Sequence, residues 1–206
     1  MTKVLILDCS PKRNGNTAKV KDLFVENLGS DVETETIKLF PNINGEGGIL
    51  PCVDCGACKK VDHCVIEDDF QKITKDDYDT VVLFAPLYMS NLPGPAFNLS
   101  SRFQYLFNNE WEMNLKHEFK QKRGIVVILG GGHSCKHLMG KTNADMAVRH
   151  AKFLFKKVGA SLEEEDVLTC LNTDDCLPLD NPDFVKNIVC VAESVCGNKA
   201  DETQKA

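Results

Sequence analysis

The stretch VLILDCSPKRNGNT, residues 4–17, decides the fold of this 206-residue chain. Its first four residues form a continuous apolar run, which is typical of a central parallel strand that is buried on both faces. Asp8 ends that run. Asn16 and Thr17 are expected to cap a helix whose apolar side chains recur with a period of about 3.6 residues and which ends at Gly29. This order of buried strand, loop and amphipathic helix indicates the first unit of an α/β fold.

The rest of the chain repeats this alternation. Apolar runs at 81–87 and 125–129 predict two further buried strands, and edge strands are expected at 32–39 and within 161–171. Helices are expected at 68–75, 95–107, 141–158 and after Pro182. Strands that alternate with helices form a parallel sheet with right-handed crossovers. The pattern therefore predicts a three-layer, doubly wound α/β fold with a five-stranded parallel sheet in the order 2-1-3-4-5.

Composition limits the kind of protein. The chain is 43% hydrophobic and fits one domain over residues 1–198, with a Gly- and Cys-rich insert at about 41–67 and a polar tail at 199–206. A net charge of −6 argues against a nucleic-acid partner. The first apolar run is too short for a signal peptide, and no run approaches the roughly 20 residues that span a bilayer. We therefore expect a cytoplasmic protein with no membrane partner.

The loop after the first strand has the properties of an anion site. In the predicted strand order, ligands bind at the carboxyl ends of strands 1, 3 and 4. This loop leads into a helix N-terminus, whose free N–H groups and dipole favour an anion. Ser10, Asn16 and Thr17 add short polar side chains, and Lys12 and Arg13 add positive charge. Neither G-x-x-x-x-G-K-[ST] nor G-x-G-x-x-G is present here, so a monophosphate ligand is the better inference.

The loops after the third and fourth strands offer a different surface. Leu87, Tyr88 and Met89 present apolar and aromatic groups against which a flat ring can pack. The run Gly130-Gly131-Gly132 permits close approach of backbone amides to a ligand. His133 follows these glycines, but a solvated loop histidine is the commoner case, so no catalytic side chain is assigned.

These three segments, in this order, resemble the NADPH-dependent FMN reductase group of the flavodoxin-like superfamily. Ser-Pro-x-x-x-Gly-Asn-Thr at 10–17 resembles its FMN phosphate loop. Pro86-Leu87-Tyr88 resembles the segment that wraps the isoalloxazine ring, although Met89 stands where related proteins often have an aromatic residue. The resemblance implies FMN-binding residues at Ser10, Lys12, Arg13, Asn16, Thr17, Pro86, Leu87, Tyr88, Met89, Gly131 and Gly132.

The sharpest local signal is Cys52-x2-Cys55-x2-Cys58-x5-Cys64. Three thiolates two residues apart can wrap one cubane and the fourth can close the site, whereas structural zinc commonly uses two separated pairs. The spacing resembles that of the iron-sulfur flavoproteins and implies a [4Fe-4S] cluster. From spacing alone, cysteines without metal and a zinc or other metal site stay open.

Together, these features predict an FMN-dependent oxidoreductase or electron-transfer flavoprotein that uses electrons from NAD(P)H or ferredoxin. The flavin carries the chemistry, so no catalytic acid or base is required. The resemblance also implies a homo-oligomer, either a dimer or a tetramer. The alternatives are a non-enzymatic electron carrier, an FMN reductase without a cluster that reduces quinone, nitro or azo acceptors, and a zinc or thiol sensor on the same fold.

Overall fold

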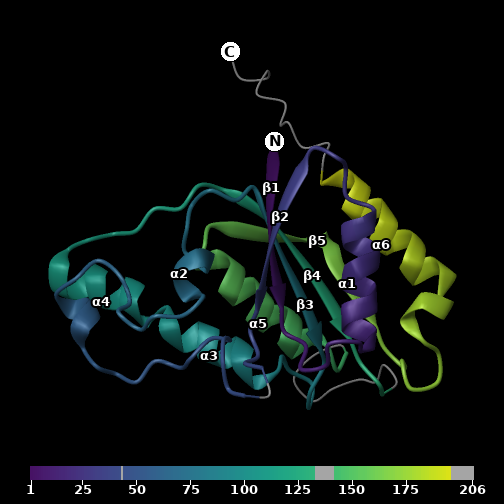
Figure 1. Ribbon diagram of the computed structural model, residues 1–206, viewed down its shortest axis with the longest axis horizontal. Coiled ribbons are helices and arrows are strands. Elements are labelled where there is room, and N and C mark those ends of the chain that lie inside the picture. Colours follow the sequence, from purple (N-terminus) through teal and green to yellow (C-terminus); the bar gives the residue numbers. More distant parts are fainter. Residues whose placement is uncertain (43, 133–141, 196–206) are drawn as a thin grey trace.

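Five parallel strands form one sheet in the order β2-β1-β3-β4-β5 in the computed structural model, which describes residues 1–42, 44–132 and 142–195 (Figure 1). The predicted strand order is therefore confirmed. Side chains of the three central strands are almost completely buried, as expected for continuous apolar runs covered on both faces. The strands are β1 (Thr2–Asp8), β2 (Val32–Lys38), β3 (Thr80–Pro86), β4 (Lys122–Leu129) and β5 (Ala160–Cys170).

Helices cover both faces of the sheet, so the molecule has three layers. On one face α1 (Asn16–Glu26) and α6 (Pro182–Ser194) pack together, with Phe24 of α1 edge-on to Phe84 of β3 at 5.5 Å. The other face carries the remaining helices, which lie on the opposite side of the sheet in Figure 1. These are α2 (Phe70–Ile73), α3 (Gly94–Arg102), α4 (Gln104–Met113) and α5 (Asp145–Lys156).

Several predicted helices differ from the observed ones. The helix expected at 141–158 is observed at Asp145–Lys156, and the first helix ends at Glu26, before Gly29. The expected helix at 95–107 is divided into α3 and α4 at Phe103, whose ring packs against Phe70 at 5.3 Å. The division also brings Tyr105 against the same ring at 5.8 Å, so burial of two aromatic side chains outweighs helix continuity. The helix expected at 68–75 shortens to the four residues of α2.

The cap expected at α1 is wrong. Gly15 occupies the N-cap position, and neither Asn16 nor Thr17 makes a capping side-chain hydrogen bond. Thr17 is instead buried. The final helix begins at Pro182, close to its predicted start, and the Asn181 side chain caps it by accepting from the Phe184 N–H at 3.1 Å. The polar tail at 199–206 lies outside the described residues.

The cysteine-rich insert follows β2 and carries little regular structure, as predicted. Its regular element is a single 3-10 turn, η1 (Ala57–Lys59). The insert runs beside α3 and α4, at the side of the molecule away from α1 and α6 (Figure 1). No helix within residues 1–42, 44–132 or 142–195 is both long and apolar enough to cross a membrane.

Candidate functional site

The sheet brings the carboxyl ends of β1, β3 and β4 to one edge, the lower edge in Figure 1. β1 and β3 are aligned so that Asp8 lies opposite Phe84, and the N–H of Cys9 donates to the Phe84 carbonyl at 2.8 Å. Across the other side of β3, the N–H of Leu87 donates to the Leu129 carbonyl at 2.7 Å. The three predicted ligand loops are therefore neighbours, at the point where the strand order reverses.

The loop after β1 is shaped around Ser10, whose side chain is buried. Its hydroxyl donates to the Lys12 carbonyl at 3.3 Å and accepts from the Lys12 N–H at 3.4 Å. Lys12 and Arg13 are exposed, and the α1 N-terminus behind them has no side-chain cap. A helix start without a cap leaves N–H groups for a ligand, so this loop fits an anionic group such as a phosphate.

Asp8 lies at the base of this loop and was not identified as a site residue from the sequence. Its carboxylate is 1% exposed, accepts from the Ser10 N–H at 3.0 Å and lies 3.2 Å from the Lys21 ammonium. Lys38 lies 3.8 Å away on the other side. Two cations offset this buried negative charge, so the loop tolerates an anion above it. The sequence signal that could have identified Asp8 was its position, because it is an acidic residue that directly follows the apolar run of a buried strand.

The loop after β3 turns sharply beyond the strand. Tyr88 and Asn91 exchange backbone hydrogen bonds at 2.8 and 2.9 Å, and the two residues between them, Met89 and Ser90, have φ values of 48° and 62°. The Tyr88 side chain is 45% exposed and that of Met89 is 97% exposed. Leu87 packs partly against the core. The loop thus presents uncovered aromatic and apolar surface at the ligand edge.

The glycines after β4 lie against the loop after β5. The Gly130 carbonyl accepts from the Thr173 N–H at 3.0 Å, and the Gly132 carbonyl accepts from the Asn172 N–H at 2.9 Å. A Cβ at Gly131 would lie 2.5 Å from a carboxylate oxygen of the exposed Asp174 side chain, so a larger residue there would require this side chain to move. Gly132 has open space around it. His133 lies outside the described residues.

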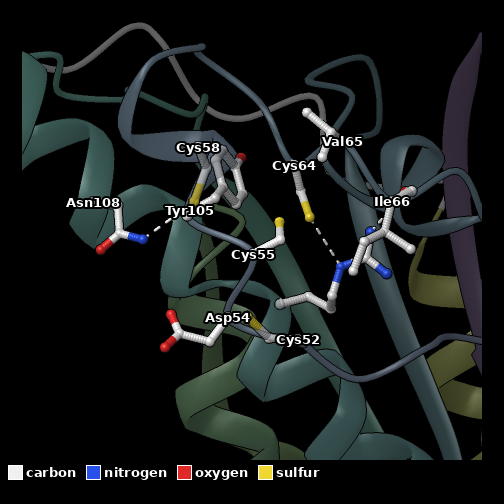
Figure 2. Close-up of a pocket in the computed structure, with 11 residues that line it drawn as sticks. Cys52, Asp54, Cys55, Cys58, Cys64, Val65, Ile66, Tyr105 and Asn108 are labelled. Carbon is white, nitrogen blue, oxygen red and sulfur yellow. Dashed lines mark hydrogen bonds between the residues drawn. The ribbon is translucent and has the colours of Figure 1, made fainter.

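A second site lies in the cysteine insert. Cys52, Cys55, Cys58 and Cys64 line one pocket together with side chains of α3 and α4. Figure 2 shows the sulfurs of Cys55 and Cys64 pointing toward one another, while Asp54 points away. All four cysteines are free thiols. Within the described part of the chain, no three His, Cys, Asp or Glu side chains are grouped closely enough to hold a single metal ion.

Two side chains that the sequence did not identify donate hydrogen bonds to these sulfurs. The Nε of Arg102 lies 3.2 Å from the Cys64 sulfur, and the Nδ2 of Asn108 lies 3.1 Å from the Cys58 sulfur (Figure 2). Arg102 is 1% exposed and also bonds to the Asp68 carboxylate at 2.5 Å. A hydrogen-bonded donor beside a thiolate is a common outer-shell feature of metal and cluster sites.

The backbone of the insert is held by buried amides. Asn109 is fully buried, and its Nδ2 donates to the carbonyls of Cys58 at 2.6 Å and Val61 at 2.8 Å. The N–H of Cys52 donates to the Ser101 hydroxyl at 2.9 Å. For Arg102, the sequence did contain a signal of burial. This charged residue falls on the same face of its helix as apolar residues that are buried.

The thiol of Cys9 differs from those of the insert. It is completely buried after β1, and burial raises its pKa to about 12, with the backbone hydrogen bond to Ala96 acting in the opposite sense. Such a thiol stays protonated and unreactive. Tyr105, which lines the cysteine pocket, has its pKa raised to about 12 by burial and then by the charge of Cys64, so its hydroxyl stays neutral.

The comparisons with known proteins agree with this arrangement. The model of a family described as NADPH-dependent FMN reductase matches residues 2–164. An iron-sulfur flavoprotein from Methanosarcina thermophila is 29% identical over 134 residues, and the match covers 64% of this chain and 65% of that protein. The chain thus spans slightly less than two thirds of this relative.

Solved structures share the fold at low sequence identity. An azoreductase from Bacillus anthracis str. Sterne superposes with a TM-score of 0.65 at 15% identity, covering 94% of this chain and 100% of that one. An FMN-dependent NADH-azoreductase from Bacillus anthracis str. Ames Ancestor, solved in complex with FMN, gives 0.56 at 16% identity, covering 96% and 98%. At these identities the likeness establishes the fold.

Proposed function

The chain belongs to the NADPH-dependent FMN reductase family, and from this premise we propose that it is an FMN-dependent oxidoreductase with a [4Fe-4S] cluster in its cysteine insert. Electrons come from NAD(P)H or ferredoxin. One observation supports FMN binding most strongly: three predicted ligand loops lie together at the carboxyl ends of β1, β3 and β4. The family to which the chain belongs is described by its FMN chemistry.

FMN supplies hydride and single-electron transfer when it is bound. Its phosphate would lie at the uncapped N-terminus of α1, held by Ser10, Asn16 and Thr17 and by the charges of Lys12 and Arg13. Asp8 fixes the loop through the Ser10 N–H, and Lys21 and Lys38 keep that carboxylate from opposing the phosphate.

The other two loops would hold the ring system. Pro86, Leu87, Tyr88 and Met89 offer apolar and aromatic surface to one side of it, since Tyr88 and Met89 are uncovered at the ligand edge. The N–H groups of Gly131 and Gly132 would face a polar ring edge, where backbone donors stabilise negative charge.

The number of thiols in the cysteine pocket supports a cluster, because four thiols line one hollow and a cubane takes four thiolate ligands. The name of the Methanosarcina relative supports the same proposal.

Two further properties are part of the proposal. The stacked pair Phe107 and Trp111, with ring centroids 6.1 Å apart and both side chains exposed, supports a homo-oligomer, either a dimer or a tetramer. Free cysteines throughout the described part of the chain support a reducing, cytoplasmic location.

The test of the enzymatic function is anaerobic reduction of the FMN-loaded protein. NADPH, NADH or reduced ferredoxin is mixed with the protein, and loss of the visible flavin absorption is followed. Rapid bleaching by a nicotinamide supports the oxidoreductase. Bleaching by ferredoxin alone would identify a ferredoxin-dependent enzyme or an electron carrier, and the absence of bleaching with all three donors would contradict the proposal.

A further inference from the structure

We propose that Arg102 and Asn108 are positioning residues that raise the reduction potential of the cluster by donating N–H···S hydrogen bonds to two of its four cysteines. This inference rests on the proposed cluster at Cys52, Cys55, Cys58 and Cys64. It adds that the site is built asymmetrically: among the residues that the structure describes, donors from α3 and α4 reach two of the four cysteine sulfurs.

The asymmetry is visible in the contacts. Asn108 donates to the Cys58 sulfur at 3.1 Å, and Arg102 donates to the Cys64 sulfur at 3.2 Å (Figure 2). Among the residues that the structure describes, the sulfurs of Cys52 and Cys55 receive no such bond, and Cys55 is exposed. Two ligands are therefore hydrogen-bonded inside the protein while a third lies at the surface.

The physical effect follows from charge. Reduction adds one electron to the cluster and so increases the negative charge that its sulfurs share. An N–H dipole pointed at a sulfur stabilises that added charge, and hydrogen bonds to the sulfurs are among the factors that set cluster potentials. Asn108 and Arg102 are 8% and 1% exposed, so water screens these dipoles weakly. Both bonds therefore favour the reduced state.

The two donors are held differently. The guanidinium of Arg102 also bonds to the carbonyls of Leu50 at 3.2 Å and Ile66 at 2.9 Å, and it pairs with Asp68. These contacts fix its direction, and Asp68 offsets its charge, so its effect on the cluster comes mainly through the Nε–H dipole. Replacing Arg102 would remove the cation beside the largely buried Asp68 carboxylate, which would keep the N–H groups of Leu50 and Phe70 as donors but lose its counter-charge. Arg102 is therefore the less suitable position for a test.

Asn108 is the better position for a test substitution. Apart from the Cys58 sulfur, its side chain has a single long contact of 3.4 Å, from Gln104. Asn108→Leu therefore removes the donor, keeps the number and branching of the side-chain heavy atoms, and leaves the insert anchored by Asn109. Asn98→Leu is the matched control, because Asn98 also donates to the insert, at the Ile49 carbonyl and 3.0 Å, without contacting a sulfur.

The experiment uses the full chain with its cluster reconstituted anaerobically. Iron per chain is measured first, and the midpoint potential of the cluster is then measured by an EPR-monitored redox titration. We expect Asn108→Leu to retain about four irons and to lower the equilibrium constant for one-electron reduction about tenfold, which is about 59 mV toward negative potential. Asn98→Leu and an Asn108→Gln variant, which restores an amide donor, should stay near the wild-type value.

Any other result of the titration or of the iron analysis would contradict a specific step of the proposal. Full iron with an unchanged potential in Asn108→Leu would overturn the inference alone. Loss of iron in that variant would show a ligand-holding role in place of tuning. An equal shift in Asn98→Leu would show general loosening of the insert. A wild-type protein that takes up no iron and inorganic sulfide would overturn the proposed cluster and this inference with it.

Discussion

The phosphate loop (residues 9–15) and the cysteine insert (residues 41–67) are positioned in opposite ways. The loop joins a buried strand to a helix, so the sheet itself fixes both of its ends. The insert has one 3-10 turn and is positioned by side chains of other elements, chiefly Arg102 and Asn109. The loop would work through backbone N–H groups and exposed charges, whereas the insert works through buried, directional contacts.

Because the two regions are positioned differently, we expect that loss of cluster binding and loss of flavin binding can occur independently. Damage to the insert should cost the cluster and leave the flavin, because no contact of Arg102 or Asn109 reaches residues 9–15 among the hydrogen bonds that the structure describes. Damage to the loop should cost the flavin and leave the cluster. The following variants test that separation.

The largest expected effect is loss of iron in Cys55→Ser. This side chain is exposed, so its replacement leaves the core intact, but one of the four proposed cluster ligands is removed. Iron should fall from about four per chain to near zero while FMN affinity stays unchanged. Iron and sulfide analysis beside a flavin titration measures both. Cys176→Ser, at another exposed cysteine, should retain full iron, and a Cys55→Ser protein that also retains it would place the cluster elsewhere.

A smaller effect is expected at the phosphate loop in Arg13→Ala. Arg13 is exposed and makes its contribution only to an anion, so folding should be unaffected. Loss of one charge-assisted contact should weaken FMN binding about tenfold, with a smaller loss at high salt. The measurement is a fluorescence titration with FMN and with riboflavin, which lacks the phosphate. Lys19→Ala, an exposed lysine further along α1, is the control; an equal loss there would show a general charge effect.

Asn109→Leu should affect the insert through stability. The substitution leaves the carbonyls of Cys58 and Val61 without their buried donor. We expect a loss of about 3 kcal/mol in the free energy of unfolding of the region, seen by denaturant unfolding and by faster amide exchange in the insert. Gln104→Ala, at an exposed position of the same helix, should change little. Equal exchange in residues 9–15 and 41–67 would contradict independent positioning.

The smallest effect concerns pH and α3, which supports the insert. Burial lowers the pKa of His150 below the value of about 6.5 that a free histidine side chain has, and its Nε2 lies 2.6 Å from the Ser100 hydroxyl of α3. The unfolded chain then binds more protons at this residue in the range between the lowered pKa and about 6.5. Stability should therefore decrease as the pH falls below about 6.5. The denaturant midpoint, measured at two pH values, should change less with pH in His150→Gln than in the wild type. An equal change in both proteins would exclude His150 as a contributor to the pH dependence.

The sequence predicted the sheet better than the insert for a physical reason. Val4–Leu7 and its counterparts are buried on both faces, so their apolar runs determine the strands and bring three loops to one edge. The division at Phe103 depends on packing with the distant Phe70, which local periodicity does not record.

The same distinction applies within the candidate sites. Cysteine spacing predicted four ligands in one short loop, and the structure places these four cysteines around one pocket, while the cluster itself stays a prediction. It did not predict Arg102 or Asn108, since their roles depend on how α3 and α4 pack beside the insert. Asp8 was passed over because a single acidic residue has no motif, although its buried contacts with Ser10 and Lys21 are evident in the structure.

We propose that one chain carries a flavin site and a separate cluster site. Cofactor analysis of the protein purified without oxygen is the direct test of both sites. FMN, iron and acid-labile sulfide are measured per chain. We expect about one FMN with about four irons and four sulfides. FMN without iron and sulfide would contradict the cluster site, and a protein that contains no flavin and does not bind added FMN would contradict the flavin site.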